Sequence, residues 1–131
     1  MNKTLHVVGV ALAAFLGGCS TYSSNMMVGR DVSYTSLTGQ REAANSVLVY
    51  ESMPQNSADL GLIEAGRCHR MFTETPPDEA LVLLDLKVAA YARGGNGITN
   101  VNVERVSALT KNCWYMLVGQ ARAFKVPVTS D

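Results

Sequence analysis

Three cysteines and His69 are the residues of this chain whose types could carry chemistry. Cys68 and His69 are neighbours, and Cys113 lies about 45 residues further along the chain. Thiolates and imidazoles together bind soft metal ions such as Zn²⁺, although a fourth ligand is not evident here. An even pair of cysteines in a small domain outside the cytoplasm is instead typical of a disulfide. The disulfide is the first expectation and a metal site the alternative, and the compartment of the protein decides between them.

The start of the chain indicates that compartment. A short basic segment, Met1-Asn2-Lys3, precedes an apolar run over residues 7–16, which is shorter than the roughly 20 residues of a membrane-spanning helix. The run ends in Leu16-Gly17-Gly18-Cys19, which resembles the lipobox of bacterial lipoproteins, whose cysteine thiol is acylated and becomes the new N-terminus. We therefore expect residues 1–18 to be a lipoprotein signal peptide and Cys19 to be the lipidated residue. An ordinary secretory signal is the alternative.

The residues after Cys19 indicate which membrane holds the anchor. In the lipoproteins that this segment resembles, an aspartate after the modified cysteine retains the protein in the inner membrane, whereas Ser20 and Thr21 stand here. Several acyl chains, at roughly 0.8 kcal/mol for each buried CH₂ group, would make the anchoring effectively permanent. We expect an outer-membrane lipoprotein on the periplasmic side.

The charge balance narrows the classes of partner. The full chain has 11 basic and 11 acidic residues. Cleavage before Cys19 removes Lys3 and therefore leaves one more acidic residue than basic residues. A net charge near −1 gives no electrostatic footprint for nucleic acid or for anionic lipid. We therefore expect no nucleic-acid partner.

The chain after Cys19 divides into a tether and one small domain. Residues 20–45 are rich in Ser, Thr, Asn, Gly and Tyr and show no sustained apolar periodicity, so that residues 19–45 are predicted to be a lipidated N-terminus with a flexible tether. Such a tether would reach about 90 Å when taut. Residues 46–126 form the predicted globular domain, and residues 127–131 a C-terminal tail.

The predicted elements of the domain follow the order β-β-α-β-β. Strands are expected over residues 46–50, 59–65, 98–106 and 114–126, with a bulge or close contact at Gly61 and antiparallel hairpins at each end. The helix is predicted to begin with Thr75 as its cap and Pro76 at its first position, and to stop at the glycines from Gly94 onward. Small residues around Gly119 would let this helix pack closely. The expected fold is α+β, with one helix packed on a sheet.

These residues also carry a family resemblance. The segments "VLVYESMPQNSADLGLIEAGRC", "GGNGITNVNVERV" and "NCWYMLVGQARAF" are similar to the RcsF-like outer-membrane lipoproteins of the Rcs envelope-stress pathway. The resemblance covers the globular domain and the lipobox, and it implies that Cys68 and Cys113 are bonded to each other. Two departures are visible: the second disulfide of the family is absent, since its cysteines would fall near Val103 and Gly119, and residues 20–45 contain no proline.

The resemblance implies a sensor that works by contact. Members of that family are held at the outer membrane, partly by β-barrel proteins and their assembly machinery, and relay envelope stress to an inner-membrane regulator of a phosphorelay. Large aromatic and arginine side chains dominate protein contacts. On residue type alone, the candidates for partner contact lie on the last strand: Trp114, Tyr115, Arg122 and Phe124.

Two other function classes compete with the sensor. A metal- or small-ligand-binding lipoprotein, or a structural lipoprotein of the envelope, is the alternative function. A bonded cysteine pair would favour the sensor, with His69 as a surface residue beside the cystine. An enzyme is not expected, because His69 is the one histidine after the signal peptide and no serine or aspartate stands in a nucleophile motif. No cofactor is expected.

Overall fold

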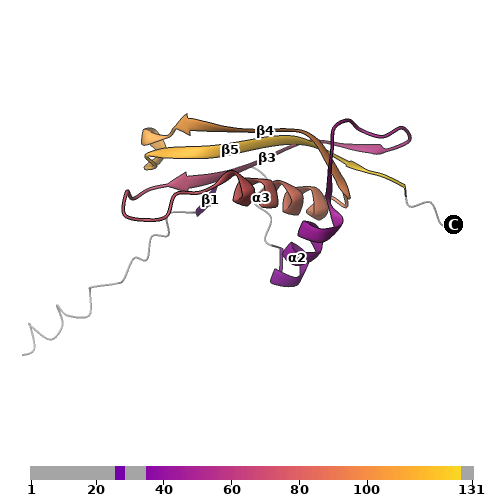
Figure 1. Cartoon of the computed structure of the whole chain (residues 1–131), viewed down its shortest axis with the longest axis horizontal. Helices are drawn as coiled ribbons and strands as arrows, with labels where there is room; N and C mark the ends of the chain where they lie inside the picture. Colours follow the sequence, from indigo (N-terminus) through magenta and orange to yellow (C-terminus); the bar gives the residue numbers. More distant parts are fainter. Residues whose placement is uncertain (1–25, 29–34, 128–131) are drawn as a thin grey trace, which may run out of the picture.

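The computed structural model describes residues 26–28 and 35–127. Cys19 and the predicted signal peptide lie outside these residues. The centre of the fold is a mixed sheet of five strands, with α3 (Glu79–Ala92) across one face and α2 (Leu37–Ser46) packed against α3 (Figure 1). In spatial order the strands are β1 (Met26–Val28), β3 (Ala58–His69), β5 (Tyr115–Lys125), β4 (Gly97–Ser107) and β2 (Leu48–Tyr50). The α+β class is confirmed, whereas the expectation of a single helix is wrong.

The pairing of the strands agrees with one predicted hairpin and contradicts the other. β4 and β5 are antiparallel neighbours joined by the short 3-10 turn η1 (Leu109–Lys111), as expected. β2 and β3 are not neighbours, because β2 pairs in parallel with β4 at the far edge of the sheet. Parallel neighbours require a long crossover, and here β3 and α3 supply it between β2 and β4.

The core lies between α3 and the face of the sheet that this helix covers. Ile63 and Ala65 of β3 stand opposite Ala121 and Gly119 of β5, and the side chains of this face are buried. The rest of the main core cluster comes from α3, β4, β5 and the residue that joins α2 to β2: Leu86, Ala89, Ala90, Ile98, Ala123 and Val47. The predicted bulge is confirmed, since the β3–β5 register shifts between Asp59 and Gly61 and Gly61 has a φ of 87°.

The helix α3 begins later than the sequence predicted. Its N-cap is Asp78, whose carboxylate accepts a hydrogen bond of 2.8 Å from the backbone N–H of Leu81. The predicted cap at Thr75 is wrong because Pro76 precedes another proline, and a residue before proline is disfavoured from the helical region. The predicted stop is confirmed: Gly94 has a φ of 79° and its N–H donates to the carbonyl oxygen of Tyr91.

Residues 37–46 form α2, so the flexible tether does not extend to residue 45 as predicted. The helix is capped by Ser36, whose hydroxyl accepts a hydrogen bond of 3.1 Å from the N–H of Gly39. The ammonium group of Lys87 on α3 donates to the carbonyl oxygen of Ala44 at 3.2 Å. The Tyr91 hydroxyl donates to Glu42 at 2.5 Å, and this hydrogen bond raises the pKa of Tyr91. Residues 37–45 therefore belong to the folded domain.

The close packing of α3 on β5 depends on Gly119. A Cβ atom at this position would lie 2.5 Å from Cγ1 of Val82 and 3.0 Å from Cδ1 of Leu86, both on α3. We expect Gly119→Ala to lower the free energy of unfolding by about 1–3 kcal/mol, because overpacking must displace the helix. Urea unfolding followed by circular dichroism measures this change. Gln120→Ala, at the exposed neighbouring position, is the matched control and should change stability little. Equal stability of both variants would contradict the close contact.

Candidate functional site

A disulfide joins Cys68 near the end of β3 to Cys113 just before β5, with an Sγ–Sγ distance of 2.07 Å and a Cα–Cα distance of 5.7 Å. This confirms the expected pairing. Both cysteines are buried and pack with Ala108 and Met116 in a second, smaller core cluster. Asn112 has a φ of 57°, and this left-handed turn directs the chain back toward β3. Both thiols are therefore consumed in a covalent bond.

Trp114 follows Cys113 directly and precedes β5. The sequence predicted that the last strand begins at Trp114, whereas β5 begins one residue later, at Tyr115. Its backbone N–H donates to the carbonyl oxygen of His69 at 2.8 Å, which continues the contact between β3 and β5. Its side chain is 60% exposed. The ring meets the ring of Phe72 edge-on, with 6.5 Å between the centroids, and Phe72 is itself 81% exposed. Trp114 is thus available to a partner.

Tyr115 is half-buried and held on both sides. Its ring centroid lies 4.9 Å from that of His69, and the guanidinium carbon of Arg105 lies 3.7 Å from the centre of the Tyr115 ring. His69 is only 8% exposed, so the expectation of a surface histidine beside the cystine is wrong. The cause is the pairing of His69 with Tyr115 at the end of the β3–β5 ladder. Tyr115 orders this end of the sheet.

Arg122 lies on the open face of the sheet, opposite the helices, and binds Asp59. The two nitrogens of its fork donate to both carboxylate oxygens, with Nε to Oδ1 at 3.0 Å. The hydrogen bond from Arg122, helped by one from the N–H of Gly61, holds the pKa of Asp59 below its usual 3.8 and raises the pKa of Arg122. Both side chains are solvent-exposed, so the pair orients Arg122 more than it stabilises the fold.

The lowered pKa of Asp59 predicts a dependence of stability on pH. A carboxyl group whose pKa is lower in the folded state stabilises the protein above the pKa of the unfolded state, and this contribution disappears as the pH falls through the folded-state value. Asp59→Asn should therefore lose less stability than the wild type when the pH falls below about 4. Urea midpoints measured across this range test it. Arg122→Gln should likewise reduce the loss of stability at acidic pH. Parallel plots of urea midpoint against pH for the wild type and both variants would contradict the pairing.

Phe124 is fully buried, which contradicts its prediction as a contact residue. Its ring meets that of Tyr50 edge-on, with 5.3 Å between the centroids. The ring also fills the space over Gly97, where a Cβ atom would lie 2.4 Å from it. Phe124 therefore packs the end of the sheet and reaches no partner. Of the four candidates, Trp114 and Arg122 are exposed, and the structure places them at different parts of the domain.

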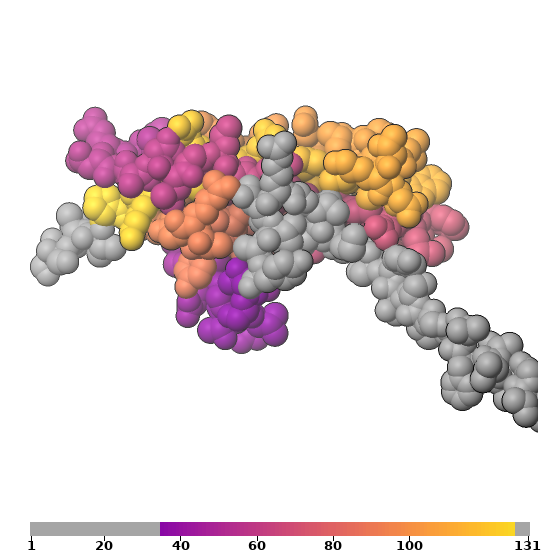
Figure 2. All heavy atoms as spheres, turned by 180° about the vertical axis from the view of Figure 1, so that it is seen from behind, coloured from indigo at the N-terminus to yellow at the C-terminus, as the bar shows by residue number. Residues whose placement is uncertain are grey.

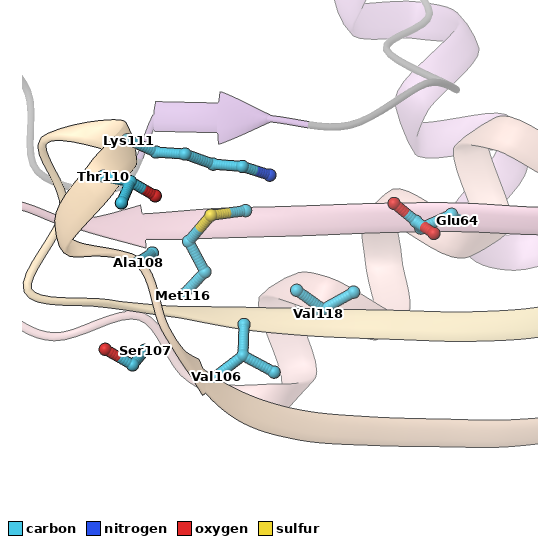
Figure 3. Close-up of a pocket in the computed structure, with 8 residues that line it drawn as sticks. All are labelled: Glu64, Val106, Ser107, Ala108, Thr110, Lys111, Met116 and Val118. Carbon is cyan, nitrogen blue, oxygen red and sulfur yellow. The ribbon is translucent and has the colours of Figure 1, made fainter.

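A small pocket lies on the open face beside the disulfide (Figure 3). Its volume is about 120 Å³, and its apolar part is made by Val106, Met116 and Val118. The Lys111 side chain extends past Met116 in the direction of Glu64 (Figure 3). Pockets that hold drug-sized ligands measure roughly 300–1,000 Å³. A hollow of about 450 Å³ beside α2 is larger but widely open to solvent. Neither feature has the shape of an enclosed ligand site.

Metal ligands do not gather in the part of the chain that the structure describes. Among residues 26–28 and 35–127, no three His, Cys, Asp or Glu side chains are close enough together to hold a metal ion. None of the helices in these same ranges has the length and apolar character needed to cross a membrane. The alternative of a soft-metal cluster at Cys68, His69 and Cys113 does not fit this oxidised state, because both thiols are bonded to each other.

Comparison with known proteins adds no relative. No protein-family model matches the chain, and no similar sequence was found among curated proteins.

Sequence reasoning missed the exposed apolar residues of this structure. Met71 and Phe72 lie in the loop after β3, and Leu62 is 71% exposed on the open face. Single apolar residues in loops carry no periodic signal, and Leu62 stands in a strand whose neighbour Ile63 is buried. The one available signal was the adjacency of Met71 and Phe72 in a polar segment close to a cysteine.

Proposed function

We propose that the protein is a lipoprotein anchored through Cys19 in the outer membrane, on the periplasmic side, that senses envelope stress. It relays the stress by contact with an inner-membrane regulator of a phosphorelay, as the RcsF-like lipoproteins that it resembles do. β-barrel proteins of the outer membrane and their assembly machinery are its proposed partners in the resting state. The observation that carries the proposal is the Cys68–Cys113 disulfide.

The disulfide supports the proposal in two ways. Structural disulfides persist in oxidising compartments such as the periplasm, where a lipoprotein of this kind would reside. The bond also removes both thiolates from metal binding, which disfavours the metal-binding alternative. The pairing is the one that the family resemblance implies for these two positions. A lipobox, a disulfide and, among the described residues, one pocket that is small and one hollow that is open together favour a protein that acts through its surface.

The open face of the sheet offers the surface for such a contact. Leu62 and Arg122 are opposite each other across β3 and β5, and the Arg122–Asp59 pair holds the guanidinium in place beside the exposed leucine. An exposed apolar side chain next to an ordered arginine matches the composition of protein–protein contact centres. The partner surface is therefore proposed to include Leu62 and Arg122.

A crosslinking experiment in cells of the source organism tests the proposal. A photo-crosslinking amino acid placed at Leu62 should capture an inner-membrane protein after envelope damage and an outer-membrane protein before it. The same amino acid at Arg41, exposed on α2, is the control and should capture neither. Mass spectrometry of the mature protein should show acyl groups on Cys19.

Two results would count against the proposal. A mature protein without acyl groups at Cys19 would remove the anchor. Acylation with the same crosslinks before and after damage would leave a structural lipoprotein of the envelope in place of a sensor.

A further inference from the structure

One end of the domain gathers exposed apolar side chains. The loop after β3 contributes Met71 and Phe72, and the connection between β4 and β5 contributes Leu109 and Trp114; all four are exposed. Figure 2 shows both connections, in rose and in orange, at the same end of the molecule. We call these four residues the apolar end. The Phe72–Trp114 contact shows that the two loops meet there.

The apolar end is held rigidly by the structure beneath it. Cys113, directly before Trp114, is bonded to Cys68, and the Trp114 N–H is bonded to His69 on the other strand. His69 and Tyr115 stack below, and Arg105 lies on the Tyr115 ring. Large apolar side chains on such a fixed support present a surface without the loss of side-chain and loop freedom that binding otherwise requires.

The direction of β1 decides which end of the domain begins closest, along the chain, to the proposed anchor at Cys19. β1 runs antiparallel to β3, with Met26 opposite Cys68 and Val28 opposite Gly66. Met26, the first residue of β1, is therefore the residue of this strand that lies nearest to His69 and to the apolar end. An extended chain spans at most about 3.6 Å per residue, so the seven residues from Cys19 to Met26 reach about 25 Å when taut. Pairing of β1 thus shortens the tether from its expected reach of about 90 Å.

We propose that the apolar end rests on the surface of the phospholipid bilayer in which Cys19 is anchored. This inference rests on the proposed acylation of Cys19. The exposed residues match a bilayer surface in chemistry: tryptophan prefers the membrane–water interface, and phenylalanine, leucine and methionine enter the boundary of the acyl chains. The four side chains of the apolar end are uncharged, so the proposed contact is apolar and does not require anionic lipid.

This placement has a consequence for the open face. With its apolar end on the bilayer, the long axis of the sheet points away from the membrane, because β3, β4 and β5 all meet that end (Figure 1). Leu62 and Arg122, near the opposite end of β3 and β5, then lie away from the bilayer, on the side from which a periplasmic partner approaches.

The test uses the intrinsic fluorescence of Trp114, which is the only tryptophan of the chain. The mature, acylated protein is reconstituted into vesicles of zwitterionic phosphatidylcholine, with and without lipids brominated on their acyl chains. We expect a blue-shifted emission and at least a twofold loss of intensity with brominated lipids. Phe72→Ser combined with Met71→Ser should reduce that quenching by half or more. Leu62→Ser, an equally exposed apolar position on the open face, is the control and should leave it unchanged.

The outcomes separate this inference from the proposed function. Acylated protein whose Trp114 is not quenched by brominated lipids overturns the inference and leaves the anchor standing. Trp114 that is shielded from aqueous acrylamide, but not quenched by brominated lipids, would show a protein contact in place of the bilayer and also overturn it. A mature protein without acyl groups overturns both.

Discussion

Replacing both Cys68 and Cys113 by alanine should lower the free energy of unfolding by about 4 kcal/mol. The disulfide spans 45 residues. In the chain-entropy treatment, a closed loop of that length reduces the freedom of the unfolded chain by this amount. A single small core supplies only about 3–5 kcal/mol of net stability. We therefore expect the double variant to be largely unfolded at 37 °C. Urea unfolding of both proteins, followed by far-ultraviolet circular dichroism, measures the difference.

The control for this prediction is the effect of a reducing agent. Reduction should destabilise the wild type to about the level of the double variant and leave the double variant unchanged. Circular dichroism is preferred to fluorescence because Trp114 is next to Cys113, and its emission would respond to the sulfur chemistry as well as to unfolding. If the wild type had the same unfolding midpoint with and without reductant, the disulfide would not be a main source of stability for the domain.

The elements with strong local signals were predictable from the sequence. The body of α3, the hairpin of β4 and β5 and the bulge at Gly61 are confirmed. These features depend on residues close together in the sequence, such as glycines that permit a positive φ and valines that alternate along a strand. The disulfide was predictable from the number of cysteines and the proposed compartment. The small residues of β5 correctly indicated a close helix contact, since Gly119 lies under Val82 and Leu86.

Features that depend on distant segments were not predictable. The buried positions of α2 are Gly39 and Ala43, which give no apolar period, so the helix is visible only through its packing on α3. The parallel pairing of β2 with β4 requires segments about 50 residues apart to meet. Phe124 lies on the same face of β5 as exposed Arg122, yet it is buried because the ring of Tyr50 packs against it. In each case a tertiary neighbour decided what local sequence left open.

The candidate site was predictable only in part, because the burial of each side chain depends on its tertiary neighbours. Residue type correctly selected Trp114 and Arg122 as large exposed side chains, but it could not separate them from Phe124 or from half-buried Tyr115. The structure adds Leu62, Met71 and Phe72, whose exposure depends on the register of β3 and on the loop that follows it. Sequence defines which residues are able to make a contact, and the fold selects those that reach the surface.

Asp85→Ala should lower the free energy of unfolding by about 3–5 kcal/mol. The Asp85 side chain on α3 is 5% exposed and pairs with Arg67 of β3, which is 17% exposed. Nε of Arg67 lies 2.5 Å from Oδ2 and Nη2 lies 2.7 Å from Oδ1, so the contact is bidentate. Removing the carboxylate takes the negative charge of Asp85 away from the largely buried guanidinium group of Arg67, and the resulting desolvation penalty is larger than the net value of the pair itself.

A double variant separates the penalty from the value of the pair. Arg67→Met combined with Asp85→Leu replaces both charges by apolar side chains and should change stability by no more than about 1–2 kcal/mol, in either direction. Asp85→Asn keeps the shape of the carboxylate and should fall between the wild type and Asp85→Ala. All variants are compared by urea unfolding in oxidising buffer, so that the disulfide stays intact. A double variant as unstable as Asp85→Ala would show that packing, and not the buried charge of Arg67, joins α3 to β3.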